Sequence, residues 1–339
     1  MALKEPIANT ATENPPHPAT GAKPSWLRNY GFIDYATQGY IALVGAIILV
    51  FHSPRVPGWF WLASAHVVTL LLVHGMIQWQ AHRPANRLLA FLRDYYPILL
   101  YTGFYRETGI LNQMLYGGYL DVWFLRLEQR LFGCQPGLEM MTWFPQRWVA
   151  ETLYAAYFSY YLMIAGVGLV LLFRRRDHFS HFVSIVSFVF YLCYLTYIFV
   201  PVIGPRIAYA NLVDVHLPPD VTPSKPVTTP SGVAESVFYQ IMGFIYEHFE
   251  TPGAAFPSSH VAVALTTLYF SWLYVRPLRW IHTVAVVLLC ISTVYGRYHY
   301  VVDVFAGIVV AAMLVSLGNW LYWRFTRAKP SVQPIGAPR

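Results

Sequence analysis

Two histidines and an aspartate in the C-terminal third of the chain have types and spacings suited to nucleophilic and acid–base chemistry. His299 and Asp303 are four residues apart, so on a helix both side chains point from one face. A carboxylate there can hold the imidazole in one tautomer, which leaves the other ring nitrogen as a nucleophile or base. His260 follows Pro257 at the expected start of another helix, where unpaired backbone N–H groups attract anions.

Arginine and serine residues near these histidines suit the binding of phosphate. Arg206 and Arg297 carry planar guanidinium groups that match phosphate oxygens, and Ser258 and Ser259 add hydroxyl and N–H donors. The set predicts phosphoryl transfer, in which catalysis is mostly positioning and charge neutralisation. Two histidines and an aspartate could also hold zinc, but two arginines would repel a cation. We therefore expect neither a metal nor a cofactor.

The composition indicates that membrane helices position these residues. Of the 339 residues, 56% are hydrophobic and only 12% are charged, whereas soluble domains are about one quarter charged. Several apolar runs are long enough to cross a bilayer. The formal net charge of +7 comes from short clusters between these runs, which is typical of membrane loops and argues against a nucleic-acid partner.

The apolar runs predict an all-α, polytopic transmembrane bundle with about eight spans. We expect one membrane catalytic domain over residues 31–325, between flexible cytoplasmic tails at 1–30 and 326–339. The N-terminal tail is polar and rich in proline, so it does not resemble a cleaved signal peptide. The expected spans are 36–51, 59–79, 95–115, 148–173, 179–202, 258–275, 280–295 and 299–323.

Basic residues predict the orientation of the bundle. Clusters follow the second, fourth, sixth and eighth spans, as in Arg174–Arg176, and the positive-inside rule places them in the cytoplasm with both termini. His178 and His181 are expected in the solvated turn beside that cluster. The segments that contain Arg206, His260 and His299 then meet at one extracytoplasmic face of the cytoplasmic or inner membrane.

Two long outer segments, 116–147 and 203–257, are expected on that same face. Within the second, apolar residues recur at helical spacing over 233–249, which predicts a short interfacial helix. Whether this helix is a lid stays open. Arg106, Glu107 and Glu151 are also open between support of the helices and contact with a substrate headgroup.

The segments around Arg206, His260 and His299 resemble, in order and spacing, the three signature motifs of the type 2 phosphatidic acid phosphatase superfamily. Its second motif is Pro-Ser-Gly-His, and this chain has Pro-Ser-Ser-His ending at His260. Its third motif is Ser-Arg, five residues, His, three residues and Asp. Ser292, His299 and Asp303 fit that spacing, but Thr293 stands at the arginine position, and Arg297 is the candidate replacement.

The first motif, Lys, six residues and Arg-Pro, departs further from the pattern. Phe199 stands at the lysine position and Ile207 follows Arg206. Gly-Pro-Arg at 204–206 is similar to a Pro-Pro-Arg element of the inositol phosphorylceramide synthase-like (inositolphosphotransferase) branch, and the segment 121–136 also resembles that branch. The resemblance covers residues 85–325.

The resemblance implies a six-helix phosphatase-like core and a metal-independent mechanism on a membrane lipid. His299 would form a phosphohistidine, Asp303 would orient it, and His260 would protonate the leaving oxygen. Arg206, Arg297, Ser258 and Ser259 would hold the phosphate. Transfer to water would make a phosphatase, and transfer to an alcohol a phosphotransferase. A non-catalytic lipid- or phosphate-binding transporter or scaffold is the alternative, and protein partners are unknown.

Overall fold

The computed structural model describes residues 24–327, except Arg28 and the segments 211–216 and 224–226. Most of the predicted tails, 1–30 and 326–339, and parts of the outer segment 203–257 therefore lie outside the described residues.

Helices form all the regular structure of the described residues, apart from one isolated bridge between Val202 and Ala254. The predicted all-α class is confirmed. In chain order the helices are η1 (Ser25–Leu27), α1 (Phe32–Phe51), α2 (Trp59–His82), α3 (Arg87–Leu111), α4 (Asp121–Phe132), α5 (Pro136–Trp143), α6 (Arg147–Arg174), α7 (Arg176–Phe199), α8 (Pro205–Ala210), α9 (Ser231–Ala234), α10 (Val237–Phe249), α11 (Ser259–Tyr274), η2 (Arg276–Leu278), α12 (Arg279–Tyr295) and α13 (Val301–Arg327).

Six stretches within the described residues are long and apolar enough to cross a membrane, namely α1, α2, α6, α7, Arg276–Tyr295 and α13. The prediction of eight spans is not confirmed. Helix α3 has the length but contains five charged residues, at 87, 93, 94, 106 and 107. Helix α11 has 16 residues and is therefore about 24 Å long, shorter than a hydrocarbon core of about 30 Å.

Helix α3 begins eight residues earlier than predicted because its charged first turns have partners. The Asn86 side chain accepts a hydrogen bond from the Leu89 N–H at 3.1 Å and so caps the helix. Arg93 pairs with the buried Asp34 of α1, and Asp94 pairs with Arg176 of α7. These ion pairs hold the starts of α1, α3 and α7 together.

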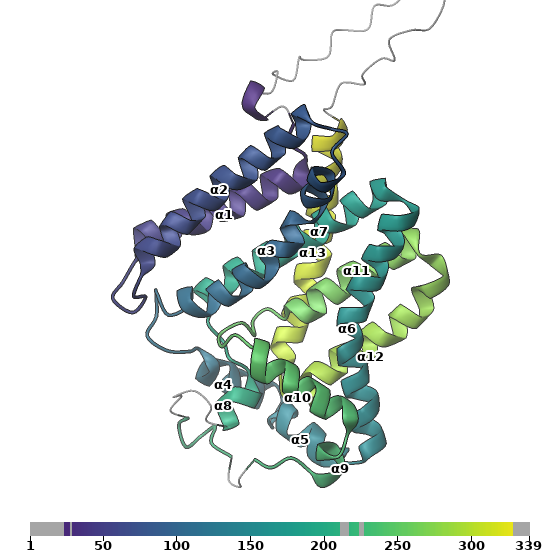
Figure 1. Cartoon of the computed structure of the whole chain (residues 1–339). Helices are drawn as coiled ribbons and strands as arrows, with labels where there is room; N and C mark the ends of the chain where they lie inside the picture. The colour runs from purple at the N-terminus through teal and green to yellow at the C-terminus, as the bar shows by residue number, and fades with distance from the viewer. Residues whose placement is uncertain (1–23, 28, 211–216, 224–226, 328–339) are drawn as a thin grey trace, which may run out of the picture.

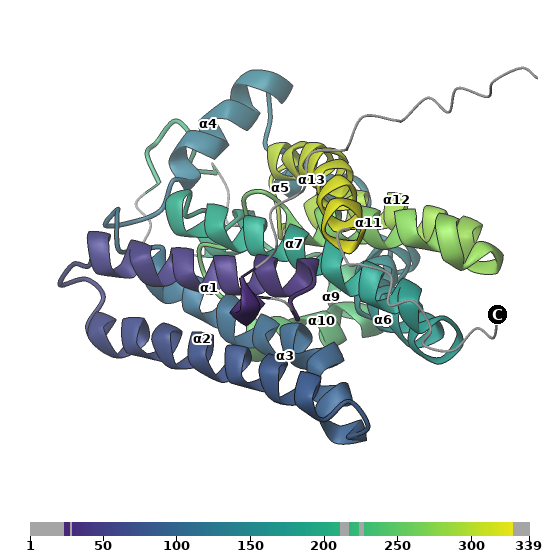
Figure 2. The same ribbon diagram turned by 90° about the horizontal axis from the view of Figure 1, so that it is seen from above.

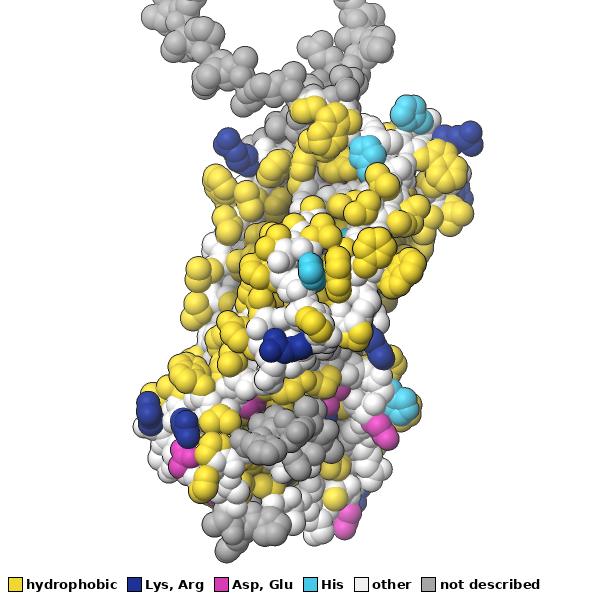
Figure 3. All heavy atoms as spheres, turned by 90° about the vertical axis from the view of Figure 1, so that its left-hand side faces the viewer, with side chains coloured by type: hydrophobic (Ala, Val, Ile, Leu, Met, Phe, Trp, Pro, Cys, Tyr) yellow, Lys and Arg dark blue, Asp and Glu magenta, His cyan; other side chains and the backbone are white. Residues whose placement is uncertain are grey.

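Helix α7 runs through the middle of the bundle and contacts α1, α3, α6, α11 and α13. Helices α1 and α2 form a hairpin at one side (Figures 1 and 2). On this side hydrophobic side chains form a band, with charged side chains above and below it (Figure 3). That distribution fits a belt of lipid around the bundle.

The start of α7 lies beside the ends of α11 and α13. His181 hydrogen-bonds to Tyr274 at 3.0 Å and to Asn319 at 2.6 Å, and it is buried. The expectation of a solvated turn was therefore wrong for His181, because its ring joins three helices. Since helices alternate in direction, the end of α7 and the starts of α11 and α13 meet at the opposite end of the bundle.

The short helices α4, α5, α8, α9 and α10 gather at that opposite end (Figure 1). The single helix predicted over 233–249 is present as two helices, α9 and α10. Rings of α10 pack on α6, where Phe238 lies 5.9 Å from Phe158 and Tyr239 lies 5.3 Å from Tyr154 between ring centroids. No sequence pattern predicted α5 or α8.

Candidate active site

The two predicted histidines lie side by side, although they are far apart in the chain. His299 stands in the turn between α12 and α13, and His260 is the second residue of α11. Nε2 of His299 is 3.4 Å from Nδ1 of His260, and the ring centroids are 5.6 Å apart. The structure thus brings the second and third sequence segments to one place.

Hydrogen bonding orients the His299 ring. Its Nδ1 lies 2.9 Å from the carbonyl oxygen of Ala255, which can only accept, so Nδ1 carries the proton. The lone pair of Nε2 then faces His260. Burial lowers the pKa of His299 to about 4, against the opposing effect of the Ala255 carbonyl, so the ring is neutral at neutral pH. A neutral imidazole with a free Nε2 can act as a nucleophile.

Asp303 is a more distant partner of His299 than was expected. Its Oδ2 is 3.5 Å from Nδ1 of His299 and accepts the Tyr300 N–H at 2.9 Å. Its Oδ1 is buried and has no hydrogen-bond partner among the described residues. The carboxylate therefore lies behind the ring, while the Ala255 carbonyl makes the closer contact.

The Arg206 loop is joined to the His299 turn through the backbone. The Arg206 N–H donates to the Arg297 carbonyl at 2.6 Å. Gly204 has φ +85°, and a Cβ there would stand 2.4 Å from the Tyr298 carbonyl oxygen. Only glycine allows this close approach, so the first and third segments form one backbone unit.

The Arg206 guanidinium contacts an acidic residue and two tyrosine rings that the sequence pattern did not predict. It pairs with Glu250, directly after α10, and lies 5.1 Å from the Tyr246 ring and 6.0 Å from the Tyr298 ring. Its Nε is buried and has no partner within the described part of the chain. The Nε–H of Arg206 thus remains available to bind an anion. Burial raises the pKa of Glu250 to about 7, against the opposing effect of Arg206.

Arg297 and Ser258 are occupied elsewhere in this structure. Arg297 donates from Nε to the Gly137 carbonyl at 3.3 Å and from Nη2 to the Thr228 carbonyl at 3.2 Å. Ser258 caps α11, because its Oγ accepts the Val261 N–H at 3.3 Å. These contacts hold loops and a helix end, so the structure does not itself join these two side chains to the histidine pair.

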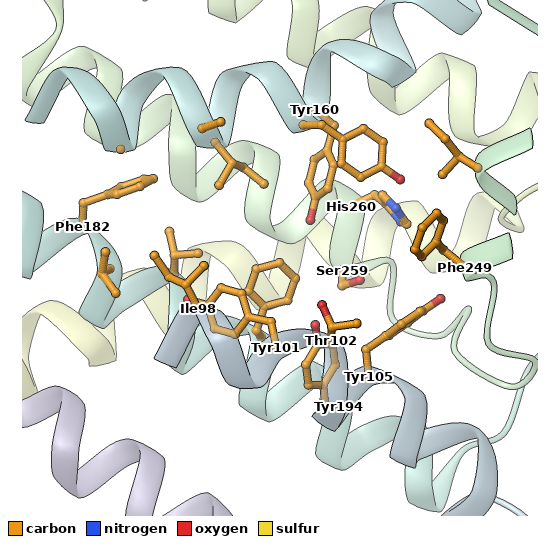
Figure 4. A pocket seen from close by; sticks show the side chains of 18 of the residues that line it. Ile98, Tyr101, Thr102, Tyr105, Tyr160, Phe182, Tyr194, Phe249, Ser259 and His260 are labelled. Atoms are coloured by element: carbon orange, nitrogen blue, oxygen red, sulfur yellow. The ribbon is translucent and has the colours of Figure 1, made fainter. Parts of the chain in front are cut away.

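A cavity of about 740 Å³ leads from His260 into the bundle. Its walls come from α3, α6, α7, α10 and α11, and Ser259 and Glu250 lie with His260 in its lining. In Figure 4, His260, Ser259 and Phe249 stand at one end, whereas Phe182 lies at the other. Most of the lining is apolar or aromatic, so a polar end continues into a hydrophobic groove.

Two tyrosines of α6 flank the His260 ring at this polar end. Tyr157 and Tyr160 have ring centroids 5.1 and 4.9 Å from that of His260. The Tyr157 hydroxyl also contacts the Tyr246 hydroxyl of α10. The sequence indicated only packing aromatics here, and their spacing of three residues on one helix face was the available signal.

Arg106, Glu107 and Glu151, whose roles the sequence did not decide, contact neighbouring helices. Glu151 accepts hydrogen bonds from the Val237 N–H at 2.8 Å and the Phe238 N–H at 3.2 Å, which fixes the start of α10. Arg106 donates to the His248 carbonyl at 2.8 Å, and Glu107 lies 3.5 Å from His66. Arg106 also lines the cavity beside the end of α10.

Comparison with known proteins identifies the family of the chain. The sequence model of the PAP2 superfamily, the type 2 phosphatidic acid phosphatases, matches residues 122–317. No curated protein and no solved structure gives a match. The matched region spans more than half of the chain and includes the Arg206 loop, both histidines and Asp303. The chain is therefore a member of the PAP2 superfamily.

Proposed function

We propose that this protein is a membrane-embedded phosphoesterase that acts on a lipid phosphate or phosphodiester through a phosphohistidine at His299. The observation that carries the proposal is the pairing of the free Nε2 of His299 with His260 at the polar end of an apolar cavity. Superfamily membership supports enzymatic activity in general, because the superfamily consists of phosphatases and phosphotransferases.

In the proposed reaction, the lone pair of His299 Nε2 attacks phosphorus and the bond from phosphorus to the leaving oxygen breaks. His260, protonated while the anionic phosphate is bound, gives a ring proton to that oxygen and becomes neutral. Water or an alcohol then attacks the phosphohistidine, His260 takes its proton, and the bond between phosphorus and nitrogen breaks. Arg206 neutralises the phosphate oxygens, with Arg297, Ser258 and Ser259 as further candidates after substrate-induced rearrangement. No step requires a metal.

The shape of the cavity supports a lipid as the substrate. Its lining on α7 extends from Phe179 to Tyr194, about 22 Å along the helix. One leaflet of the hydrocarbon core is about 15 Å thick, so the groove can hold a long acyl chain. With the basic loops in the cytoplasm, as the positive-inside rule predicts, the phosphate end lies on the extracytoplasmic side.

A lipid panel tests this proposal. Purified protein is given phosphatidic acids with long and short chains and a soluble phosphomonoester, in the presence of a chelator. Released phosphate and transfer to added alcohols, including inositol, are measured. We expect turnover of long-chain lipid, and a loss of roughly 10²–10⁴-fold in His260→Ala. Lipid binding without turnover, or full activity in His299→Ala, would instead favour a transporter or scaffold.

A cavity variant tests the role of the groove. Ala165 lines it on α6, and Ala165→Phe should reduce turnover of long-chain lipid more than that of short-chain lipid. The matched control is Leu162→Phe on the same helix, at a position that is 60% exposed. Equal effects of Ala165→Phe on both chain lengths would contradict binding of the tail in this groove.

A further inference from the structure

Helix α4 lies at the outer end of the bundle, yet it carries two buried carboxylates. Asp121 and Glu128 are 0% and 1% exposed. They are seven residues apart, about two helical turns, so both point from the same face. A buried carboxylate is costly unless donors surround it. Burial raises the pKa of Asp121 to about 6 and that of Glu128 to about 7, and their backbone hydrogen bonds oppose this effect.

Asp121 binds the first and third sequence segments at once. Its Oδ2 accepts the Ile203 N–H at 2.9 Å, and its Oδ1 accepts the Gly204 N–H at 3.0 Å. The same Oδ1 accepts the Tyr300 hydroxyl at 2.8 Å. Gly204 is two residues before Arg206, and Tyr300 directly follows His299. One carboxylate therefore fixes the separation of these two loops.

Glu128 fixes the start of α13. Its Oε1 accepts the N–H of Val301, the first residue of α13, at 2.5 Å. A carboxylate at a helix N-terminus is favourable because the backbone N–H groups there have no partner within the helix. Asp303 lies in the same first turn. The position of α13 behind His299 thus depends on Glu128.

Phe124, between the two carboxylates, connects α4 to the second segment. Its ring stacks on Tyr300 with centroids 5.7 Å apart, and it lies 5.0 Å from Phe256. Phe256 directly precedes Pro257 at the start of the second motif. One face of α4 therefore contacts all three segments that form the candidate site.

We infer that Asp121 and Glu128 are positioning residues, which hold Arg206 and the His299–His260 pair at the separation that phosphoryl transfer requires. The inference rests on the proposed function. Neither carboxylate touches a reacting atom, since each acts through the donors of the loops. A misplacement of a catalytic group by about 1 Å can cost 10²-fold in rate, so loss of either carboxylate should lower kcat strongly.

The test compares kcat, KM and Tm of Asp121→Asn and Glu128→Gln, with long-chain phosphatidic acid in detergent micelles. Each substitution keeps the size of the side chain but replaces an acceptor oxygen by a donor. We expect kcat to fall by about 10- to 100-fold. KM should stay close to that of the wild type, because the groove between α3, α6 and α7 still binds the tail.

Two controls separate positioning from general stability. Thr37→Val removes a buried 3.0 Å hydrogen bond to Tyr191 between α1 and α7, and should lower Tm without lowering kcat. Arg126→Gln removes an exposed ion pair to Asp220 from α4 itself, and should leave kcat unchanged.

Retention of kcat in both carboxylate variants would overturn the inference. The inference would also be overturned if Thr37→Val had the same Tm as the carboxylate variants and lost as much kcat as they do. If Asp121→Asn does not fold, Tyr300→Phe removes only one of the three donors to Asp121 and must still lower kcat. Failure of the wild type to turn over any lipid phosphate would instead overturn the proposed function.

Discussion

If Arg206 binds the substrate phosphate as proposed, Glu250 competes for it through their ion pair, and this competition should make phosphate binding depend on pH. The pair is partly buried, with side chains 30% and 19% exposed for Arg206 and Glu250. Burial raises the pKa of Glu250 to about 7. Below that pH the carboxyl is neutral and releases Arg206. A bound phosphate, with a charge of about −1.5 to −2, raises the pKa of Glu250 further, so substrate binding takes up a proton.

The size of the pH effect on kcat/KM follows from the coupling between proton uptake and substrate binding. One proton taken up per substrate lowers kcat/KM by at most about tenfold for each pH unit above 7, since one pKa unit corresponds to about 1.36 kcal/mol. The second ionisation of a phosphomonoester, with a pKa of about 6, is largely complete by pH 7. The protonation of His260 affects both proteins alike, so between pH 7 and 8.5 the difference in slope between wild type and Glu250→Gln reports Glu250. In Glu250→Gln the neutral amide mimics the protonated carboxyl. Its kcat/KM should therefore fall less steeply and exceed that of the wild type at pH 8.5.

The assay is the pH profile of kcat/KM, which reports ionisations of the free enzyme. Glu247→Gln is the matched control, because Glu247 is an exposed carboxylate in the last turn of α10, three residues before Glu250. It should keep the slope of the wild type. Equal slopes in wild type and Glu250→Gln, or a lower kcat/KM of Glu250→Gln at every pH, would refute the reasoning.

Three further substitutions test the geometry. Arg206→Lys should lower kcat/KM by about tenfold or more with little change in Tm, because an ammonium group cannot replace the planar fork; wild-type kinetics would contradict this. Gly204→Ala forces a Cβ to 2.4 Å from the Tyr298 carbonyl oxygen at positive φ, so Tm should fall by several degrees, and an unchanged Tm would show that the loops can separate freely. Glu151→Gln removes the anion at the start of α10. Hydrogen exchange should then become faster over residues 237–241, and unchanged exchange would argue against the cap.

The helices were predictable because their apolar runs are long. Expected and observed ends agree within four residues for most spans, but not at the start of α3. There, Arg93 and Asp94 looked like loop residues, whereas their partners Asp34 and Arg176 come from other helices. Local sequence does not reveal such partners. Two of the eight predicted spans are not candidate crossings within the described residues, since α3 is charged and α11 is short.

The proximity of His260 and His299 was predictable from topology, because alternating helices place their segments at one end. The hydrogen-bond and ion-pair partners of the site residues were not predictable. The closest acceptor for His299 is the carbonyl of Ala255, and backbone groups carry no signal in the side-chain pattern. Glu250 stands in a long outer segment without a recognisable motif. Asp121 was noted only for a family resemblance, and its three donors come from loops about 80 and 180 residues away.

Trapping of the covalent intermediate tests the central claim most directly. Protein mixed with radiolabelled lipid phosphate is quenched within the first turnover, digested under alkaline conditions and analysed by mass spectrometry. We predict an acid-labile phosphate on His299 in the wild type and none in His299→Ala. A phosphate on another residue, or undiminished turnover in His299→Ala, would contradict the proposed mechanism.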